Sequence, residues 1–280
     1  MTLPGTLAAL AATLAAAPAQ AGSTSLVFCA PGYPGNTAEA QPAMDAFAAA
    51  LSAAAGLPAG SLAAVYHEAE RDGLSRLARD DAALALVPLP FFLEHERALG
   101  LRPLLQVVEQ GGAPLERWTL WARKGRVVGP ASLEGWQVTS TAGYSAAFLR
   151  GPVLGGFGGL PRGARVAASG AILSALRRAA AGEDVALVLD RAQAASLPGL
   201  PFAADLEAVA TSPALPVALV ATVGRRLPPA RARALAGALA RLPADARGAE
   251  ALAAIRLSGF APVDEKALSA ARKAFAGARR

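Results

Sequence analysis

The strongest constraint on the fold is a regular alternation of short apolar runs with helical stretches. In the first third of the chain each apolar run is followed by a stretch with apolar residues at helical spacing. We expect strands at 25–30, 62–66 and 83–87, and helices at 39–55, 72–79 and 91–98. Because such short units alternate strictly, they predict a parallel sheet with crossover helices.

The pattern then restarts, which indicates a second lobe. Extended segments at 104–109 and 118–124 lead into strands at 137–139, 165–168 and 185–189, with helices at 144–149 and 171–181. Two more extended segments, 206–211 and 216–223, precede helices at 228–241, 244–257 and 263–276.

We therefore predict an α/β fold with two Rossmann-like lobes joined by a two-crossover hinge. Residues 110–205 would form lobe two, inserted into a lobe one made of 22–109 and 206–280. In such folds ligands bind in the cleft that the carboxyl ends of the strands face.

The N-terminus has the pattern of a signal peptide. Residues 1–21 carry no charge, 7–17 form an apolar run, and Ala19-Gln20-Ala21 fits the small-x-small cleavage rule. The run is too short for a membrane span, which needs about 20 residues. We expect cleavage after Ala21 and a periplasmic, monomeric protein; the alternative is a flexible Ala-rich N-terminus, since no basic residue follows Met1.

Charge does not indicate a nucleic-acid partner. The net charge is +6, and basic residues gather in the C-terminal third, around Ala- and Leu-rich helices with few aromatic residues. A nucleic-acid interface needs a basic face with aromatic or groove-reading elements. These charges are better explained as solvated helix faces.

The most informative local pattern is a strand followed by a hydroxyl- and glycine-rich turn at 138–145. Backbone N–H groups at a helix N-terminus, with Ser and Thr hydroxyls, form an anion site. The candidate ligand contacts in this turn are Ser140, Thr141, Gly143, Tyr144 and Ser145. The alternative is that Ser140 or Thr141 only caps the next helix.

Other candidates follow the remaining strands. Gly32 and Tyr33 come after the first strand and can present backbone amides and a phenol, while Pro90 and Phe91, after the third, would give the cleft an apolar wall. Further contacts are expected from Glu116 and Trp118 near the lobe crossing, and from Asp190 after the strand at 185–189. Asp190 could accept a hydrogen bond from a ligand or cap the next helix.

No catalytic or metal site is predicted. Ser145 almost completes a G-x-S-x-G nucleophile elbow, but that fold places its histidine after the serine, and both His67 and His95 precede it. One cysteine, Cys29, and two isolated histidines do not give metal-ligand spacing. No phosphate-binding glycine motif followed by Lys occurs, so we expect no enzyme, metal or cofactor.

The order of elements, with LEGWQV at 133–138 followed by STAGY at 140–144 and GEDVA at 182–186, resembles the periplasmic phosphate/phosphonate-binding component of ABC transporters. The resemblance implies a type 2 periplasmic-binding-protein fold, a membrane permease as partner, and Ser140, Thr141 and Tyr144 as anion-holding positions. The chain departs from the family at Ala142, where the family has Ser, and at 88–91, where the family has polar or aromatic groups.

These observations predict an extracytoplasmic solute-binding protein that captures a small oxyanion or a phosphate- or phosphonate-like ligand between two lobes. The alternative is a periplasmic carrier of a hydrophobic or amphipathic ligand, a lipid or sterol, in the same cleft.

Overall fold

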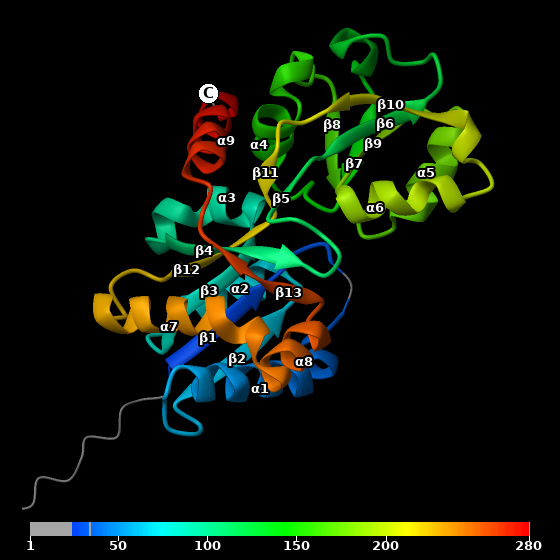
Figure 1. The fold of residues 1–280 in the computed structure, drawn as a ribbon. Coiled ribbons are helices and arrows are strands. Elements are labelled where there is room, and N and C mark those ends of the chain that lie inside the picture. The colour runs from blue at the N-terminus through cyan, green and yellow to red at the C-terminus, as the bar shows by residue number, and fades with distance from the viewer. Residues whose placement is uncertain (1–23, 34, 280) are drawn as a thin grey trace, which may run out of the picture.

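The computed structural model describes residues 24–33 and 35–279, so the expected signal peptide and its cleavage site lie outside the described residues. The chain forms two α/β lobes (Figure 1). Each lobe is built on its own sheet, and a two-stranded ribbon lies between them.

The sheet of lobe one has six strands in the order β13-β4-β12-β3-β1-β2. The first three predicted strands are present as a parallel set, with β1 paired to both β2 and β3. β12 runs antiparallel to β3 and β4, and β13 runs antiparallel to β4. The bounds are β1 Thr24–Cys29, β2 Leu62–His67, β3 Ala82–Pro88, β4 Arg102–Glu109, β12 Ala218–Thr222 and β13 Leu257–Ala261.

Helices cover both faces of this sheet. On one face lie α1 Thr37–Ala54, α7 Pro229–Arg241 and α8 Ala246–Ala254; on the other lie α2 Glu70–Leu77 and α3 Leu89–Leu99. Asn36 begins α1 by accepting a hydrogen bond from the Glu39 N–H. The apolar stripe of α1 is buried as expected, and Phe47 packs edge-on against Phe28 of β1 at 5.5 Å between ring centroids.

The sheet of lobe two has five strands in the order β10-β6-β9-β7-β8. β7 pairs in parallel with β8 and β9, whereas β6 runs antiparallel to β9 and β10. The strands are β6 Thr119–Arg123, β7 Gln137–Ser140, β8 Arg165–Ala168, β9 Val185–Leu189 and β10 Leu206–Thr211. The helices are α4 Ala146–Phe148, which continues into a π-helix at Leu149–Val153, α5 Ile172–Ala180 and α6 Arg191–Ser196.

Short 3-10 turns complete the described elements: Pro130–Leu133, Gly155–Phe157, Leu197–Gly199, Ala203–Asp205 and Leu242–Ala244.

The hinge is a two-stranded ribbon. β5 Leu115–Glu116 pairs antiparallel with β11 Leu215–Pro216, so the two crossings between the sheets lie side by side. A third connection, at 262–264, leads from β13 to α9 Glu265–Ala278. α9 packs beside the π-helix of lobe two (Figure 1), and Arg272 forms an ion pair of 2.6 Å with Glu96 of α3 in lobe one.

The structure differs from the sequence-based division in three places. Residues 206–211 belong to the sheet of lobe two, and α9 contacts both lobes instead of completing lobe one. The helix expected at 244–257 ends at Ala254, and β13 follows it. Arg256 adopts a left-handed backbone with φ 59°, which ends the helix and redirects the chain into a strand.

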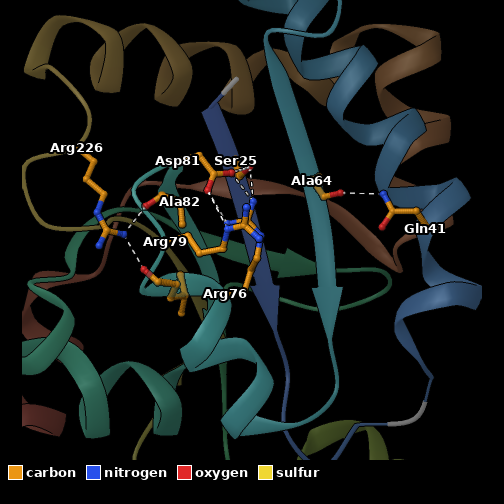
Figure 2. Close-up of polar contacts among 9 residues, drawn as sticks. Ser25, Gln41, Ala64, Arg76, Arg79, Asp81, Ala82 and Arg226 are labelled. Carbon is orange, nitrogen blue, oxygen red and sulfur yellow. Dashed lines mark hydrogen bonds and ion pairs between the residues drawn. The ribbon is translucent and has the colours of Figure 1, made fainter. Parts of the chain in front are cut away.

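A polar network fixes the start of β1 (Figure 2). The Asp81 carboxylate accepts hydrogen bonds from Arg76, at 3.0 Å from its Nη1, and from the Ser25 hydroxyl at 2.7 Å. These two donors lower the pKa of Asp81 to about 2. Arg226 donates to the carbonyl of Leu77 at the C-terminus of α2, where a cation is favourable, and to the carbonyl of Ala82 at the start of β3.

Candidate functional site

Two loops from different lobes meet at the carboxyl ends of their strands. The loop after β1 carries Gly32, whose φ is +84°, and it lies against the Thr141 backbone after β7. A Cβ added at Gly32 would lie 3.1 Å from the Thr141 carbonyl carbon and closer still to its oxygen. The lobes are therefore in contact at this point, and only glycine fits there.

The turn after β7 is buried where the lobes meet. Ser140, Thr141 and Ser145 are each less than 5% exposed. The Ser145 hydroxyl donates to the Glu94 carboxylate of α3 in lobe one at 2.8 Å. Gly143 packs against the backbone at the end of β8. The turn therefore lies between the two lobes.

The helix start differs from the expectation. Ser145, placed inside the helix by the sequence, is the N-cap residue of α4, and neither Ser140 nor Thr141 caps it. The amides of Gly143 and Ser145 bond to carbonyls of the turn itself, at 3.1 and 3.0 Å. Any ligand contact from this turn must therefore depend on its hydroxyls and its remaining amides more than on a helix N-terminus.

Tyr144 contributes a hydroxyl on the side of α3. The hydroxyl is buried and has no hydrogen-bond partner among the described residues, although the Phe91 backbone N–H lies near it. Burial raises the pKa of Tyr144 well above its usual value. A buried polar group without a full set of partners is costly, so this hydroxyl is a candidate ligand contact only where a movement of the lobes exposes it.

Acidic side chains surround Tyr33 between the lobes. Burial raises the pKa of the Tyr33 phenol, and the charges of Asp190, Glu116 and Glu109 raise it further. Glu116 lies on the hinge strand β5, and burial, followed by the charges of Asp190 and Glu109, raises its pKa to about 8. One cation balances them, since the Arg191 guanidinium lies 2.9 Å from the Glu109 carboxylate.

Asp190 takes the helix-capping role that the sequence left open. Its carboxylate accepts the Gln193 N–H at 2.8 Å, and the Gln193 side chain accepts the Asp190 N–H at 3.3 Å, which is a reciprocal cap at the start of α6. Burial raises the pKa of Asp190, opposed by these backbone hydrogen bonds. Its charge still acts on Tyr33.

Three of the expected contacts lie elsewhere. Phe91 is fully buried and stacks on His95 at 4.6 Å between ring centroids. Trp118 is 2% exposed and packs edge-on against Phe148. Pro90 is buried in the first turn of α3. These side chains belong to the core between the lobes, because the residues after β3 enter a packed helix instead of a cleft wall.

A cavity of about 420 Å³ adjoins Tyr33 on the side of lobe one. It lies at the carboxyl ends of β1 and β3, between the first half of α1 and the start of β13. Of its lining residues, sequence reasoning placed Tyr33 among the ligand contacts, and Gly35 and Pro88 in loops expected to face the cleft. It missed Glu109, although a carboxylate at the end of a strand was a usable signal, and it missed Arg256, whose position depends on the unforeseen β13.

Neither a metal cluster nor a membrane span is found in the described part of the chain. No group of three His, Cys, Asp or Glu side chains is placed to hold a metal ion within residues 24–33 and 35–279. No helix over the same ranges has the length and apolarity needed to cross a bilayer.

Comparison with solved structures defines the class of protein. A binding-protein component of an ABC phosphonate transporter from Pseudomonas aeruginosa is similar with a TM-score of 0.64 and 15% identity, covering 92% of this chain and 87% of that one. PhnD1 from Prochlorococcus marinus, in complex with methylphosphonate, has a TM-score of 0.58 and 14% identity over 89% and 98% of the two chains. A Xanthomonas citri protein bound to chloride ion has a TM-score of 0.69 and 18% identity, covering 92% of this chain and 98% of that one. The fold is that of a type 2 periplasmic binding protein.

The family follows from the sequence itself. Residues 34–268 match the model of the ABC-transporter phosphonate periplasmic substrate-binding proteins, and the chain belongs to that family. Its members are substrate-binding components that work with a membrane permease, not a class of enzymes. A comparison with curated protein sequences found no match.

Proposed function

We propose that this protein is an extracytoplasmic receptor that holds a small oxyanion-bearing solute between its lobes and delivers it to an ABC permease. The observation that carries the proposal is the contact between the Gly32–Tyr33 loop and the 140–145 turn. That contact joins the strand ends of both lobes beside the buried residues Ser140, Thr141 and Ser145. Hinged receptors enclose their ligands at such a junction.

The acidic groups around Tyr33 favour a solute that also carries a positive group. Glu109 already pairs with Arg191, and Glu116 is largely neutral at pH 7, so Asp190 is the acidic group near Tyr33 that is left to pair with an amine. A purely anionic ligand would meet unfavourable charge there, whereas an amine would pair with a carboxylate. Glu116, with its pKa near 8, is mostly protonated at neutral pH and can donate a hydrogen bond to a ligand oxygen. An aminoalkylphosphonate matches both features.

The family match supports this polar solute. The lipid or sterol alternative has only apolar walls in its favour, and two of the residues expected in such a wall, Pro90 and Phe91, are buried in the core.

The test is calorimetric titration with inorganic phosphate, methylphosphonate and 2-aminoethylphosphonate. We expect the amine-bearing probe to bind most tightly, with a micromolar or lower Kd. Ser140→Ala combined with Thr141→Ala should cost about 1–3 kcal/mol of binding, because charge-assisted hydrogen bonds are removed. The control pair is Ser132→Ala with Ser258→Ala, a half-buried and an exposed serine outside the turn.

If neither phosphonate nor phosphate binds the wild-type protein, the proposal fails. Equal affinities in the test pair and the control pair would remove the 140–145 turn from the ligand site.

A further inference from the structure

The cavity beside Tyr33 has a composition that the polar site does not explain. Its wall is mainly apolar and comes from the strands β1, β2, β3, β4, β12 and β13 and from the helices α1 and α8. The principal apolar lining residues are Phe28, Met44, Leu86, Val107, Val217 and Leu257. A receptor for a purely polar solute has no use for such a surface, because apolar walls strengthen binding only when they are removed from water.

The cavity and the polar site share two residues. Tyr33 lines the cavity and also lies among the carboxylates of Glu116 and Asp190 between the lobes. Glu109 lines the cavity while its carboxylate holds Arg191 of lobe two. The two compartments are therefore adjacent.

The size of the cavity suits a hydrocarbon group. An apolar cavity of about 150 Å³ already accepts benzene, and the cavity here is about 420 Å³. That volume also lies within the range of about 300–1,000 Å³ of small-molecule sites. The lining also holds three charged residues, Glu39, Glu109 and Arg256, and the polar residues Asn36 and Tyr66, so part of the wall is polar.

We propose that this cavity is a substituent pocket, which takes the aliphatic or aryl group of an organophosphonate whose polar head lies between the lobes. The ligand class is then a phosphonate with a hydrocarbon chain longer than methyl. This inference rests on the proposed function, and the experiment below separates the failure of one from the failure of the other.

The test is a calorimetric series of methyl-, butyl- and hexylphosphonate against the mature protein. Each methylene buried in an apolar pocket adds about fourfold to affinity, the equivalent of about 0.8 kcal/mol. We expect the Kd to fall steadily along the series in the wild-type protein.

Two variants each place a large side chain at a position that lines the pocket. Ala43→Phe projects from α1 and Ala254→Phe from the end of α8, and both positions line the cavity. Within each variant, hexylphosphonate should lose its advantage over methylphosphonate. The matched control is Ala38→Phe, at an exposed position of α1 outside the cavity lining, which should keep the full dependence on chain length. The thermal midpoint of each variant shows that it is folded.

The outcomes are distinct. If methylphosphonate binds and longer chains bind no better, the pocket inference is overturned and the proposed function stands. If hexylphosphonate still binds more tightly than methylphosphonate in both pocket variants, the hexyl group binds elsewhere and the inference is again overturned. If no phosphonate binds the wild-type protein, both proposals fall.

Discussion

Replacing Gly32 by Ala tests whether contact between the lobes controls ligand binding. Gly32 has a φ of +84°, and an added Cβ would lie less than 3.0 Å from the Thr141 carbonyl oxygen, whereas ordinary contact begins at 3.4 Å. The loop and the turn would have to separate by at least about 0.4 Å. Because the obstructing atoms are backbone and cannot rotate away, the separation must come from opening the lobes or shifting the loop.

The Gly32→Ala substitution should destabilise the closed arrangement, in which the two lobes are in contact. Overpacking a well-packed contact costs about 1–3 kcal/mol. If only the closed arrangement holds ligand, that cost weakens the apparent affinity by about 5- to 150-fold. A separate cost of about 1–2 kcal/mol arises from placing a side chain at positive φ, and it lowers the stability of the protein as a whole.

Gly60→Ala is the matched control. Gly60 has a φ of +75°, and an added Cβ there would meet nothing within 4 Å. Both variants should lose similar stability in urea denaturation, but only Gly32→Ala should lose affinity for methylphosphonate and show a larger radius of gyration by small-angle scattering. Equal affinities in the two variants would refute the reasoning.

Two pH-dependent predictions follow from buried or bonded carboxyl groups. Asp81 has a folded pKa of about 2, below its ordinary 3.8, so its contribution is present above pH 4 and is lost as the pH falls toward 2. Asp81→Asn should lower the free energy of unfolding at pH 7 by about 1–2 kcal/mol, a value discounted because the carboxylate is 31% exposed. The difference in unfolding free energy between the variant and the wild type, measured by urea denaturation, should become smaller below pH 4. A difference that stays constant with pH would contradict this. Glu116 has a folded pKa of about 8, above its ordinary 4.5, so it destabilises the fold increasingly as the pH rises between these values. The thermal midpoint of Glu116→Gln, relative to the wild type, should therefore rise from pH 5 to pH 8, and a flat difference would count against a buried neutral Glu116.

The alternating pattern was sufficient to predict the core of lobe one. β1, β2 and β3 lie where short apolar runs end in polar or turn-forming residues, and they pair in parallel as expected. The sequence pattern does not predict in the same way which sheet the strands β10 and β13 join. The pattern of β10 is compatible with either sheet, and its pairing with β6 is decided by contacts far away in sequence. β13 depends on the backbone of one residue, Arg256, which no periodicity encodes.

The site was predictable where it depends on the ends of strands. The rule that these ends face the cleft led to Gly32, Tyr33, Thr141 and Asp190, and Gly32 meets Thr141 between the lobes. Glu116 was proposed from its place near the lobe crossing. The same rule was misleading for apolar residues. A Phe that follows a strand can line a cleft, or it can belong to the next helix and be buried in the core. Phe91 takes the second course, and its burial against His95 is a property of tertiary packing.

The discontinuous layout of lobe one sets an order on its assembly. The sheet of lobe two uses only residues 119–211, so its strands are all available once that stretch has been synthesised. The sheet of lobe one lacks the central strand β12, between β3 and β4, until residue 222 has emerged. During vectorial synthesis, the segment in the middle of the chain can thus complete its sheet while β3 and β4 still lack the strand that joins them.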